Sequence, residues 1–338
     1  MIEKYMLSVI ILDYGRHIYL EDCLKSLADA YSGKMNEHEI EIILVTCSRD
    51  MDKKPFFKEL KDKLPLKHYF LLTKNKSELR NHGINNARGD IVYFIDDDIK
   101  VEKGFIKNIL IEFNKHPKAA IIGGPNLTPK DSPVIERCQG YVLGSSWGAS
   151  KMSKRYNIIE EDTEADQSGL ILCNLGFRRE IFEKEKLLFD IRLDYNEENH
   201  LLQNLKRRGY KMMFSPEIIV YHYRRSKITD YCRQVFNSGV GRARSIKIDT
   251  GNFSILYFMP FFFFLYSISV FLLLKMDNMF IIPLIIYLFI TLVFTAKIFL
   301  NKEKGIIIGL LSFLLFFLSH ICYGIGILVG ILMPVGKK

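Results

Sequence analysis

Three consecutive carboxylates, Asp96, Asp97 and Asp98, directly follow the apolar run Ile-Val-Tyr-Phe-Ile. The run predicts a buried strand, so the three side chains are expected at its carboxyl end, where their mutual repulsion is costly unless a cation or a basic partner relieves it. Carboxylate oxygens suit Mg²⁺ or Mn²⁺, ions that bridge a few protein ligands to substrate phosphates. The residues alone also allow an acidic turn or the cap of a helix from Glu102 to Phe113.

Four further side chains have chemistry that such a site would use. A guanidinium pairs two phosphate oxygens at once, which suits Arg80 to a diphosphate, although a solvated helix residue is the alternative. Imidazole can serve as a third ligand for Mn²⁺, which suits His222, although a lone histidine is more often structural. Glu197 and Glu198 precede a helical segment, where a carboxylate can act as a general base or form a pair that favours the helix dipole.

Two other features could contact a sugar. Gly123-Gly124-Pro125 follows the apolar run at 119–122, and glycine lets a backbone approach a ligand closely, although an ordinary turn explains it equally well. Trp147 is the only tryptophan and lies among glycines and serines. Its face could stack on an acceptor sugar, and packing in a core is the alternative.

The elements that position these residues follow from the alternation of apolar runs and helical segments before Ile255. This alternation predicts an α/β fold with a mostly parallel, doubly wound sheet. Ligands bind beyond the carboxyl ends of such strands, so the residues just after Leu12, Thr46 and Ile95 are candidates. The expected strands are 7–12, 39–46, 67–72 and 91–95, and the expected helices begin at 19, 56 and 78.

Three stretches of this region resemble glycosyltransferase family 2 in order and spacing. They are SVIILDYGRHIYLEDCLKSL, SELRNHGINNARGDIVYFIDDD and EENHLLQNLKRRGYKMMFSPEIIVYHYRR, and the resemblance covers Leu7 to Arg244. The resemblance implies a GT-A type fold, a Rossmann-like mixed and mostly parallel sheet flanked by helices. It also identifies Asp96 to Asp98 as a DxD motif that binds a nucleotide sugar with Mn²⁺ or Mg²⁺.

The resemblance assigns roles to single residues. Asp96 would contact the ribose or uracil, Asp98 would hold the metal, and Glu198, the second acid of its pair, would be the base. The implied catalytic residues are Glu198 and Glu197. The implied nucleotide-sugar contacts are Asp13, Tyr14, Thr46, Arg80 (followed by Asn81), Asp96, Asp97 and Gly124. The implied metal ligands are Asp98, His222 and Asp96, and the expected acceptor contact is Trp147.

One stretch departs from the family pattern. After the second strand the family usually has an acidic residue that reads the base, whereas this chain has Thr46-Cys47-Ser48-Arg49-Asp50. Either Asp50 acts from a displaced position or Thr46 takes the role. The nucleotide base is therefore not predicted.

The C-terminal part is predicted to lie in a membrane. The stretches 255–274, 279–296 and 305–333 are nearly free of charge and have no polar face, so three transmembrane helices are expected rather than buried helices of a soluble domain. Before them, Arg224 to Lys247 mixes apolar and basic residues, which predicts an interfacial helix. The expected domains are a catalytic domain at 1–225, an interfacial segment at 226–252 and a membrane domain at 253–338.

Basic residues predict the orientation. The segment before the first apolar stretch and the link from Lys297 to Lys304 are both basic, so both are expected on the cytoplasmic side, together with the catalytic domain, in a multi-pass protein of the cell membrane. Three crossings would then place Lys337 and Lys338 outside. That position conflicts with the positive-inside tendency.

Composition excludes several other classes. The net charge of +9 could suggest a nucleic acid partner, but the apolar C-terminal part points to an anionic membrane surface, and no nucleic acid is expected. Six scattered cysteines without a CxxC pair argue against a zinc site and a disulfide framework. The N-terminal apolar run is too short for a signal peptide, so the first part is expected in the cytoplasm.

These observations together predict an enzyme, an inverting and metal-dependent hexosyltransferase. The donor would be a nucleoside diphosphate sugar, and the acceptor a lipid-linked saccharide at the cytoplasmic membrane face, in cell-surface polysaccharide or glycan assembly. One alternative is a polyprenyl-phosphate glycosyltransferase, which need not use Glu198 as a base. The other is a catalytically inactive membrane scaffold that binds a nucleotide or partner enzymes.

Overall fold

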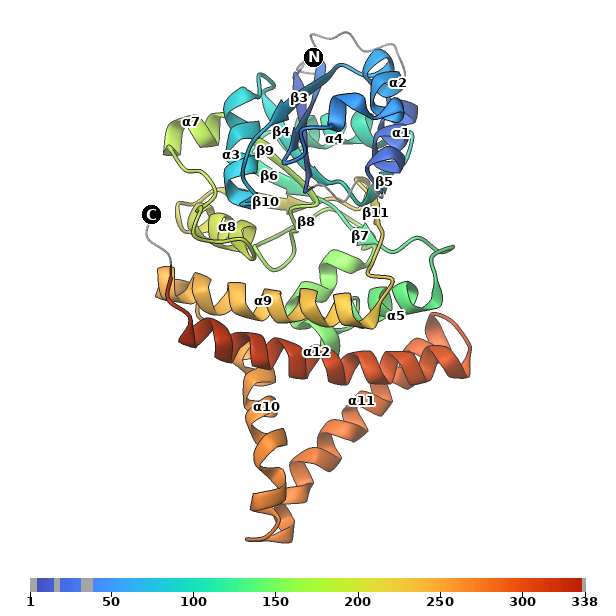
Figure 1. The fold of residues 1–338 in the computed structure, drawn as a ribbon, viewed down its shortest axis with the longest axis vertical. Coiled ribbons are helices and arrows are strands. Elements are labelled where there is room, and N and C mark those ends of the chain that lie inside the picture. The colour runs from blue at the N-terminus through green and yellow to red at the C-terminus, as the bar shows by residue number, and fades with distance from the viewer. Residues whose placement is uncertain (1–4, 15–18, 32–38, 336–338) are drawn as a thin grey trace. The chain divides into compact units, whose positions relative to one another are not determined.

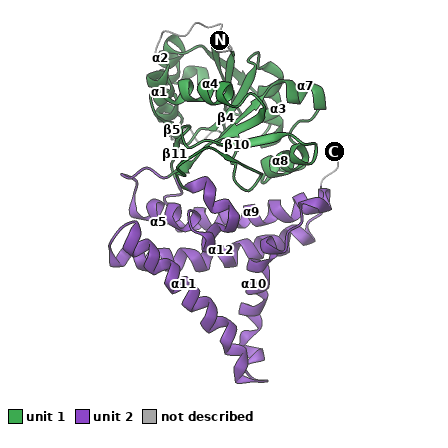
Figure 2. Ribbon diagram, turned by 180° about the vertical axis from the view of Figure 1, so that it is seen from behind, with its two compact units in different colours: residues 1–127, 157–223 green, residues 128–156, 224–338 purple. Residues whose placement is uncertain are grey.

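The computed structural model describes residues 5–14, 19–31 and 39–335, and Figure 1 shows the elements in chain order. The chain forms two compact units, each of which collects two stretches of sequence. Figure 2 distinguishes them by colour. Unit 1 is Met1–Leu127 with Asn157–Tyr223, and unit 2 is Thr128–Tyr156 with Arg224–Lys338.

The segment 128–156 differs from the expectation of one continuous domain over residues 1–225. It leaves unit 1 and joins the C-terminal helices. The physical reason is apolar burial, because Cys138 and Val142 of this segment are fully buried in one cluster with Leu315 and Phe316. The sequence pattern does not show which core this segment enters.

Unit 1 is built on a mixed sheet, which among the described residues has eight strands in the order β3-β2-β1-β4-β9-β6-β10-β8. Neighbouring strands from β3 to β4 run parallel, and β9 is antiparallel to both β4 and β6. The strands are β1 Leu7–Asp13, β2 Ile40–Thr46, β3 Leu66–Phe70, β4 Ile91–Asp96, β6 Ala119–Gly123, β8 Thr163–Glu164, β9 Asn174–Arg178 and β10 Lys211–Phe214. The mixed, mostly parallel sheet predicted from the sequence is thus confirmed.

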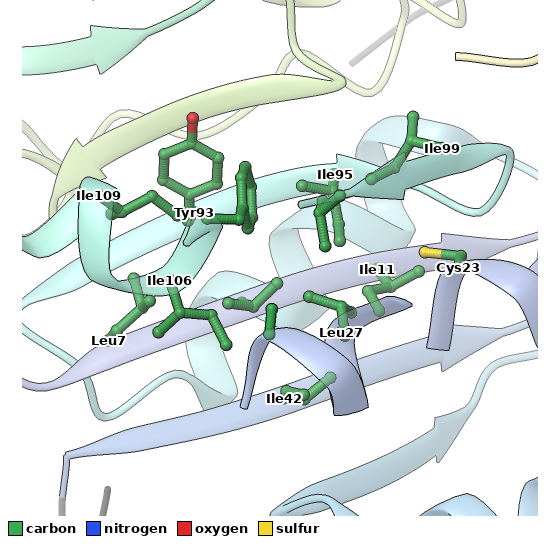
Figure 3. Close-up of a cluster of buried hydrophobic side chains, with 14 of the residues drawn as sticks. Leu7, Ile11, Cys23, Leu27, Ile42, Tyr93, Ile95, Ile99, Ile106 and Ile109 are labelled. Atoms are coloured by element: carbon green, nitrogen blue, oxygen red, sulfur yellow. The ribbon is translucent and has the colours of Figure 1, made fainter. Parts of the chain in front are cut away.

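Both faces of this sheet are covered, which is why its strands are apolar throughout. In β1, Leu7, Val9 and Ile11 enter one core (Figure 3) while Ile10 and Leu12 enter the other. The first core is closed by α1 Leu20–Ala30, α2 Pro55–Lys63 and α4 Phe105–Lys115. The second is closed by α3 Lys76–Asn86, α7 Glu180–Glu185 and α8 Glu197–Arg207. A short 3₁₀ turn, η1, spans Met51–Lys53.

A second, three-stranded sheet lies next to the acidic run and has the order β5-β11-β7. Its strands are β5 Ile99–Val101, β7 Asn126–Leu127 and β11 Val220–His222. Because β5 follows directly, Asp97 and Asp98 form the turn between β4 and β5, and α4 begins only at Phe105 with Gly104 as its cap. The alternative in which the acidic run caps a helix is thereby removed.

Unit 2 consists of helices among its described residues. The α-helices are α5 Val134–Leu143, α6 Ser146–Ala149, α9 Ile228–Ile248, α10 Ile255–Leu273, α11 Ile282–Asn301 and α12 Ile306–Leu332. The 3₁₀ turns are η2 Ser150–Tyr156, η3 Thr250–Asn252 and η4 Asn278–Ile281. Helices α10, α11 (with η4) and α12 are long and apolar enough to cross a membrane, as the sequence predicted. The expected link at 297–304 is shorter than predicted, because α11 continues to Asn301.

Candidate active site

The acidic run and His222 meet where the two sheets of unit 1 adjoin. Asp96 ends β4, and antiparallel pairing of β11 with β5 brings His222 opposite Ile99. His222 Nε2 lies 2.8 Å from Asp98 Oδ1. One ligand atom from each of Asp96, Asp98 and His222 lies within 4.8 Å of the others. The three predicted metal ligands are therefore brought together, although their role stays a prediction.

The donor set fits a divalent cation. Two carboxylates and one imidazole suit Mn²⁺ or Mg²⁺ better than soft metals that prefer thiolates. Asp98 and His222 are buried, so a cation here would offset carboxylate charge that water reaches poorly. Behind the imidazole, buried Asn126 places its Nδ2 atom 3.2 Å from His222 Nδ1. This contact orients Nε2 toward Asp98, as outer partners of metal-binding histidines commonly do.

The Gly123-Gly124-Pro125 segment is shaped by packing against backbone. A Cβ atom on Gly124 would lie 2.1 Å from the carbonyl oxygen of Ile218, so only glycine fits without movement. Buried Asn174 donates from Nδ2 to the carbonyl oxygens of Pro125 at 3.1 Å and Ile218 at 2.6 Å. These contacts give Gly124 a structural reason, and its contact with the donor sugar stays a prediction.

Arg80 occupies the centre of the buried charges. Its Nη1 atom donates to Glu197 Oε1, and its Nη2 atom lies 4.0 Å from Asp96 Oδ1. Both Arg80 and Glu197 are almost fully buried. A guanidinium is planar and presents five donors, so it can hold Glu197 on one side and still offer donors toward the acidic run.

The electrostatics of this pair follow from burial. Burial alone would lower the pKa of Arg80, but its neighbours Tyr14, Glu197 and Asp96 raise it, so the guanidinium stays charged. Burial raises the pKa of Glu197 to about 7, against the opposing effect of Arg80 and with a further rise from Glu198. Glu197 Oε2 is buried and has no hydrogen-bond partner among the described residues. Glu197 is thus a buried carboxylate that orients Arg80.

Glu198 differs from its neighbour in exposure. It is the second residue of α8, is half-buried, and accepts one hydrogen bond of 2.9 Å from Asn199 Nδ2. Asn196, the cap of α8, makes no side-chain capping bond there. Of the two predicted catalytic acids, Glu197 is engaged with Arg80, and Glu198 is the one that a substrate hydroxyl could reach.

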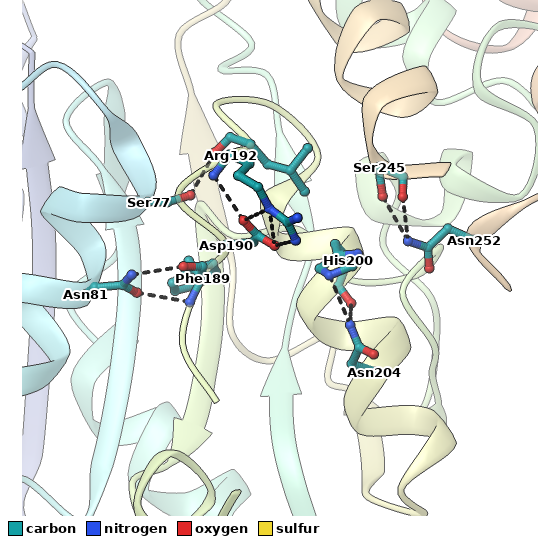
Figure 4. Close-up of polar contacts among 10 residues, drawn as sticks. Ser77, Asn81, Phe189, Asp190, Arg192, His200, Asn204, Ser245 and Asn252 are labelled. Atoms are coloured by element: carbon teal, nitrogen blue, oxygen red, sulfur yellow. Dashed lines mark hydrogen bonds and ion pairs between the residues drawn. The ribbon is translucent and has the colours of Figure 1, made fainter. Parts of the chain in front are cut away.

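Side chains of α3 hold the segment that precedes these acids. Figure 4 shows Asn81 making two bonds to the backbone of Phe189, from Nδ2 to the carbonyl and from the amide to Oδ1, each 2.9 Å long. Ser77 Oγ donates to the carbonyl of Leu193 at 2.8 Å, and Asn75 Nδ2 to that of Ile191 at 2.7 Å. In the Arg80-Asn81 pair, Arg80 therefore binds Glu197, whereas Asn81 holds the backbone of the 189–193 segment.

Lys76, for which the sequence predicts no role, lies between two tyrosine rings. Its ammonium is 4.3 Å from the ring centroid of Tyr195 and 5.3 Å from that of Tyr14. No described carboxylate forms an ion pair with it. Lys76 is also the first residue of α3, where the helix dipole disfavours a positive charge. The sequence carries no motif for it, because the rings come from segments far apart in the chain.

Two of the residues near the expected base site, Thr46 and Asp50, have polar partners within the chain. Thr46 Oγ1 lies 2.9 Å from His68 Nε2 and donates to the carbonyl of Ser48 at 3.1 Å. Asp13 is fully buried at the end of β1, next to Thr46 in the register of β1 and β2. Asp50 is exposed and pairs with Lys53 at 2.7 Å. Their roles in reading the base stay predictions.

Trp147 is held inside unit 2. Its Nε1 atom donates to Thr291 Oγ1 at 3.0 Å. Its ring lies 5.2 Å from that of His320 and 5.5 Å from that of Tyr287, measured between centroids. Packing among helices, the alternative that the sequence left open, is what the structure shows for this ring, and its acceptor role stays a prediction.

Comparison with known proteins gives both a family model and relatives. The model described as "Glycosyl transferase family 2" matches residues 8–185. A relative from Methanococcus voltae, named dolichyl N-acetyl-alpha-D-glucosaminyl phosphate 3-beta-D-2,3-diacetamido-2,3-dideoxy-beta-D-glucuronosyltransferase, is 24% identical over 334 residues, 94% of this chain and 95% of the relative. The minor teichoic acid biosynthesis protein GgaB of Bacillus subtilis (strain 168) is 30% identical over 115 residues, which are 33% of this chain and 12% of that protein.

Two solved structures share the fold. The mannosyltransferase PcManGT from Pyrobaculum calidifontis, in complex with GDP-Man and Mn²⁺, gives a TM-score of 0.54 at 12% identity and covers 75% of this chain and 66% of its own. S. aureus TarS 1-349 in complex with UDP-GlcNAc gives 0.50 at 18% identity, with 70% and 66% covered. This likeness concerns the fold, and it confirms the architecture predicted from the sequence.

Proposed function

Because the chain belongs to glycosyl transferase family 2, whose model matches residues 8–185, we propose that it transfers a sugar from a nucleoside diphosphate sugar to a lipid-linked saccharide, with inversion at the anomeric carbon. The observation that carries this proposal is the cluster of Asp96, Asp98 and His222 with Arg80 beside it. The cluster stands at the carboxyl end of β4, where parallel α/β sheets bind ligands.

Asp96, Asp98 and His222 would hold Mn²⁺ or Mg²⁺ in this proposal. When bound, the ion supplies positive charge that stabilises a diphosphate as it leaves. Asn126 keeps His222 in the orientation that ligation needs, and Asn174 braces the adjoining Pro125 carbonyl. These contributions come from the chain itself and exist before any ligand arrives.

Two cations of α3 would bind the diphosphate. Arg80 and Lys76 are one helical turn apart, so their side chains share a face of α3. Glu197 fixes Arg80, and Tyr14 and Tyr195 enclose Lys76. The hydroxyl oxygen of Tyr14 is buried without a hydrogen-bond partner among the described residues, which supports a ligand at this place. We therefore add Lys76 to the residues that the sequence suggested for donor binding.

Glu198 acts as the general base of the proposed reaction. Its carboxylate takes the proton of the acceptor hydroxyl, whose oxygen forms the new bond to the anomeric carbon from the side opposite the diphosphate. The bond from that carbon to the β-phosphate oxygen breaks, and the nucleoside diphosphate leaves with the electron pair. Positioning and electrostatics supply most of the rate in such a displacement.

The acceptor is proposed from the membrane helices and the named relative. The Methanococcus voltae protein is named for a dolichyl phosphate-linked N-acetylglucosamine acceptor. Unit 2 carries three helices apolar enough for a bilayer, which would keep the catalytic unit near a lipid-linked substrate. We place the catalytic unit on the cytoplasmic face, because the segment before α10 is basic. The family match and the M. voltae relative favour an active enzyme with a saccharide acceptor over a scaffold or a lipid phosphate acceptor.

The proposal is tested by donor turnover. The purified full chain in detergent is given uridine or guanosine diphosphate sugars with Mn²⁺, and release of the nucleoside diphosphate is measured. We expect metal-dependent release that EDTA abolishes and that Asp98→Ala lowers by at least about 100-fold, since a lost electrostatic group at a reacting centre has effects of this size. Asp50→Ala, which removes an exposed carboxylate, is the matched control. Absence of metal-dependent turnover with every nucleotide sugar would contradict the proposal.

A further inference from the structure

The three apolar helices of unit 2 do not have equivalent surroundings. Helices α10 and α11 form a hairpin, and near its tip Tyr266 Oη donates to the carbonyl of Phe280 at 2.7 Å. Most of the large apolar side chains of these two helices are exposed. With 19 and 20 residues, each matches the roughly 30 Å hydrocarbon core of a bilayer.

Helix α12 instead runs alongside α9, as Figures 1 and 2 both show. Tyr231 Oη lies 2.6 Å from Ser319 Oγ, and further along Lys247 Nζ donates to the carbonyl of Met333 at 2.9 Å. Between these points the backbones approach closely, since a Cβ atom on Gly326 would lie 2.1 Å from the carbonyl oxygen of Phe236. The two helices are therefore side by side over most of the length of α9.

Helix α9 cannot itself cross a bilayer. Its 21 residues include five charged ones, Asp230, Arg233, Arg242, Arg244 and Lys247. Two of these charges lie in the first six residues and three in the last seven, so the longest uncharged run, 234–241, has eight residues. That is far short of the roughly 20 apolar residues that a crossing needs. A helix that stays beside α9 along its length has the same direction, so α12 cannot cross the bilayer while α9 remains at its surface.

The start of α12 is also tied to polar groups. Arg137 of α5 pairs with Glu303, just before α12, with Nη2 and Oε1 2.7 Å apart. At the other end of α12, Lys247 binds its last carbonyl oxygens. A spanning helix would need one of these ends on the far side of the bilayer. Here charged side chains of α5 and α9 hold both ends.

The opposite side of α12 is apolar and exposed. Ile307, Leu310, Leu314 and Phe317 recur at three- and four-residue spacing, which places them on one stripe of the helix. The side that faces α9 and the other helices contains the buried residues, among them Ser312, Ser319 and Gly326. A stripe of this kind fits the acyl region of a membrane that lies along the helix.

We propose that the bilayer is crossed by α10 and α11 alone, and that α12 lies in the plane of one leaflet together with α9, with its exposed stripe against the lipid chains. Backbone groups of a helix bond to one another, so a helix is stable at this depth. Two crossings return the chain end to the face on which α9 lies. The conflict between Lys337, Lys338 and the positive-inside tendency then disappears.

The number of crossings tests this proposal. Full-length chain is produced in bacteria with green fluorescent protein or alkaline phosphatase fused after Lys338. We expect fluorescence and no phosphatase activity, the result for a cytoplasmic chain end. An epitope inserted after Met276, at the tip of the hairpin, is the matched control and should be reached only from outside. The same fusions placed before Met1 report the face of unit 1.

Each outcome either supports or overturns the proposal of two crossings. If the reporters at both chain ends give the same face while the Met276 epitope lies on the opposite face, two crossings are established. Phosphatase activity after Lys338 with a fluorescent N-terminal fusion would mean that α12 crosses, and would overturn the proposal. Activity of both reporters at Lys338 would also overturn it, because a single arrangement is proposed. None of these outcomes depends on whether the chain transfers a sugar.

Discussion

The two units differ in what they bury and what they expose. In unit 1, Arg80, Asp98 and Glu197 are buried near the carboxyl end of the central strand β4, and apolar cores close both faces of the sheet. In unit 2, large apolar side chains such as Leu310 and Phe271 are exposed, and helices approach through glycines. One chain is therefore built for two solvents. Unit 1 excludes water to strengthen its charges, whereas unit 2 leaves apolar surface for lipid.

The largest expected effect comes from removing the basicity of one side chain in unit 1 without changing its packing. In Glu198→Gln the side chain keeps its size but loses its basicity, so we expect kcat to fall by about 1,000-fold, within the range for a lost general base. Donor KM should stay within about twofold, because Arg80 and Lys76 are intact. Transfer to a lipid-linked saccharide is measured with radiolabelled donor.

Glu217→Gln is the matched control, because Glu217 is an exposed carboxylate of the same unit. It should leave kcat unchanged. Full activity of Glu198→Gln on a saccharide acceptor would exclude Glu198 as the base. Retained turnover on a polyprenyl phosphate acceptor would instead favour the lipid phosphate as the acceptor.

A methyl group probes the glycine contacts of unit 2. A Cβ atom at Gly326 meets the Phe236 carbonyl, whereas at Gly309 its nearest neighbour is Thr295 Cγ2 at 3.9 Å. Both sites are helical, so alanine gains the same helix propensity in each. We expect Gly326→Ala to destabilise the protein by about 2 kcal/mol through overpacking, and Gly309→Ala to be neutral or slightly stabilising.

Thermal unfolding of the detergent-solubilised chain, followed by circular dichroism, measures this difference. Nucleotide binding to unit 1 should persist in both variants below the transition. Equal melting temperatures for the two variants would mean that α9 and α12 do not pack as closely as described.

The sequence predicts which segments are buried, but it does not predict which segments pack against one another. Apolar runs report burial, so β1, β4 and the three apolar helices were found from them. The runs do not say which surface covers which, and so they do not show that residues 128–156 group with the C-terminal helices. The proximity of Asp98 and His222 came from family resemblance, because the pairing of β5 with β11 joins positions far apart in the chain.

The residues for which the sequence predicts no role are polar, and their contacts are with groups far away in the chain. Asn126 and Asn174 are fully buried amides that bond to groups more than forty residues away. Nothing local distinguishes them from turn residues, which asparagine commonly forms. Lys76 was missed similarly, because its environment is two rings contributed by separate loops.

Lys76 offers a smaller test of the claim that unit 1 holds charge for a ligand. Lys76→Gln should raise donor KM about tenfold, because a hydrogen bond to a charged group contributes about 1.5 kcal/mol. Lys74→Gln is the matched control, since Lys74 is exposed two residues earlier. We expect it to change KM less than twofold.

The ligand group that Lys76 contacts is identified by comparing nucleotides. Binding of nucleoside monophosphate and diphosphate is measured by calorimetry with Mn²⁺. A loss confined to the diphosphate would assign Lys76 to the β-phosphate. Equal affinities of Lys76→Gln and the unaltered chain for every donor would show that the lysine only packs between the rings.

The smallest expected effect concerns the pH dependence of unit 1. Burial alone would raise the pKa of Glu41, but hydrogen bonds from Lys67 Nζ at 2.5 Å, Ser8 Oγ and the Arg88 amide, both at 2.6 Å, outweigh it, and the pKa lies below its ordinary value. A carboxylate whose pKa is lowered by folding stabilises the fold at pH values above its unfolded-state pKa. This stabilisation is lost as the pH falls through its folded-state pKa.

Glu41→Gln should therefore destabilise the chain by about 1 kcal/mol at pH 7, with a difference that shrinks toward acid pH as the unaltered chain loses its carboxylate. Melting temperatures between pH 7 and the acid limit of solubility measure this convergence. The exposed Glu59→Gln, whose partner Lys63 lies one turn away, is the control and should show a much weaker pH dependence. Parallel curves for Glu41→Gln and the unaltered chain would mean that the buried carboxylate does not link the stability of unit 1 to pH, and the contrast with the lipid-facing unit would then rest on the active-site charges alone.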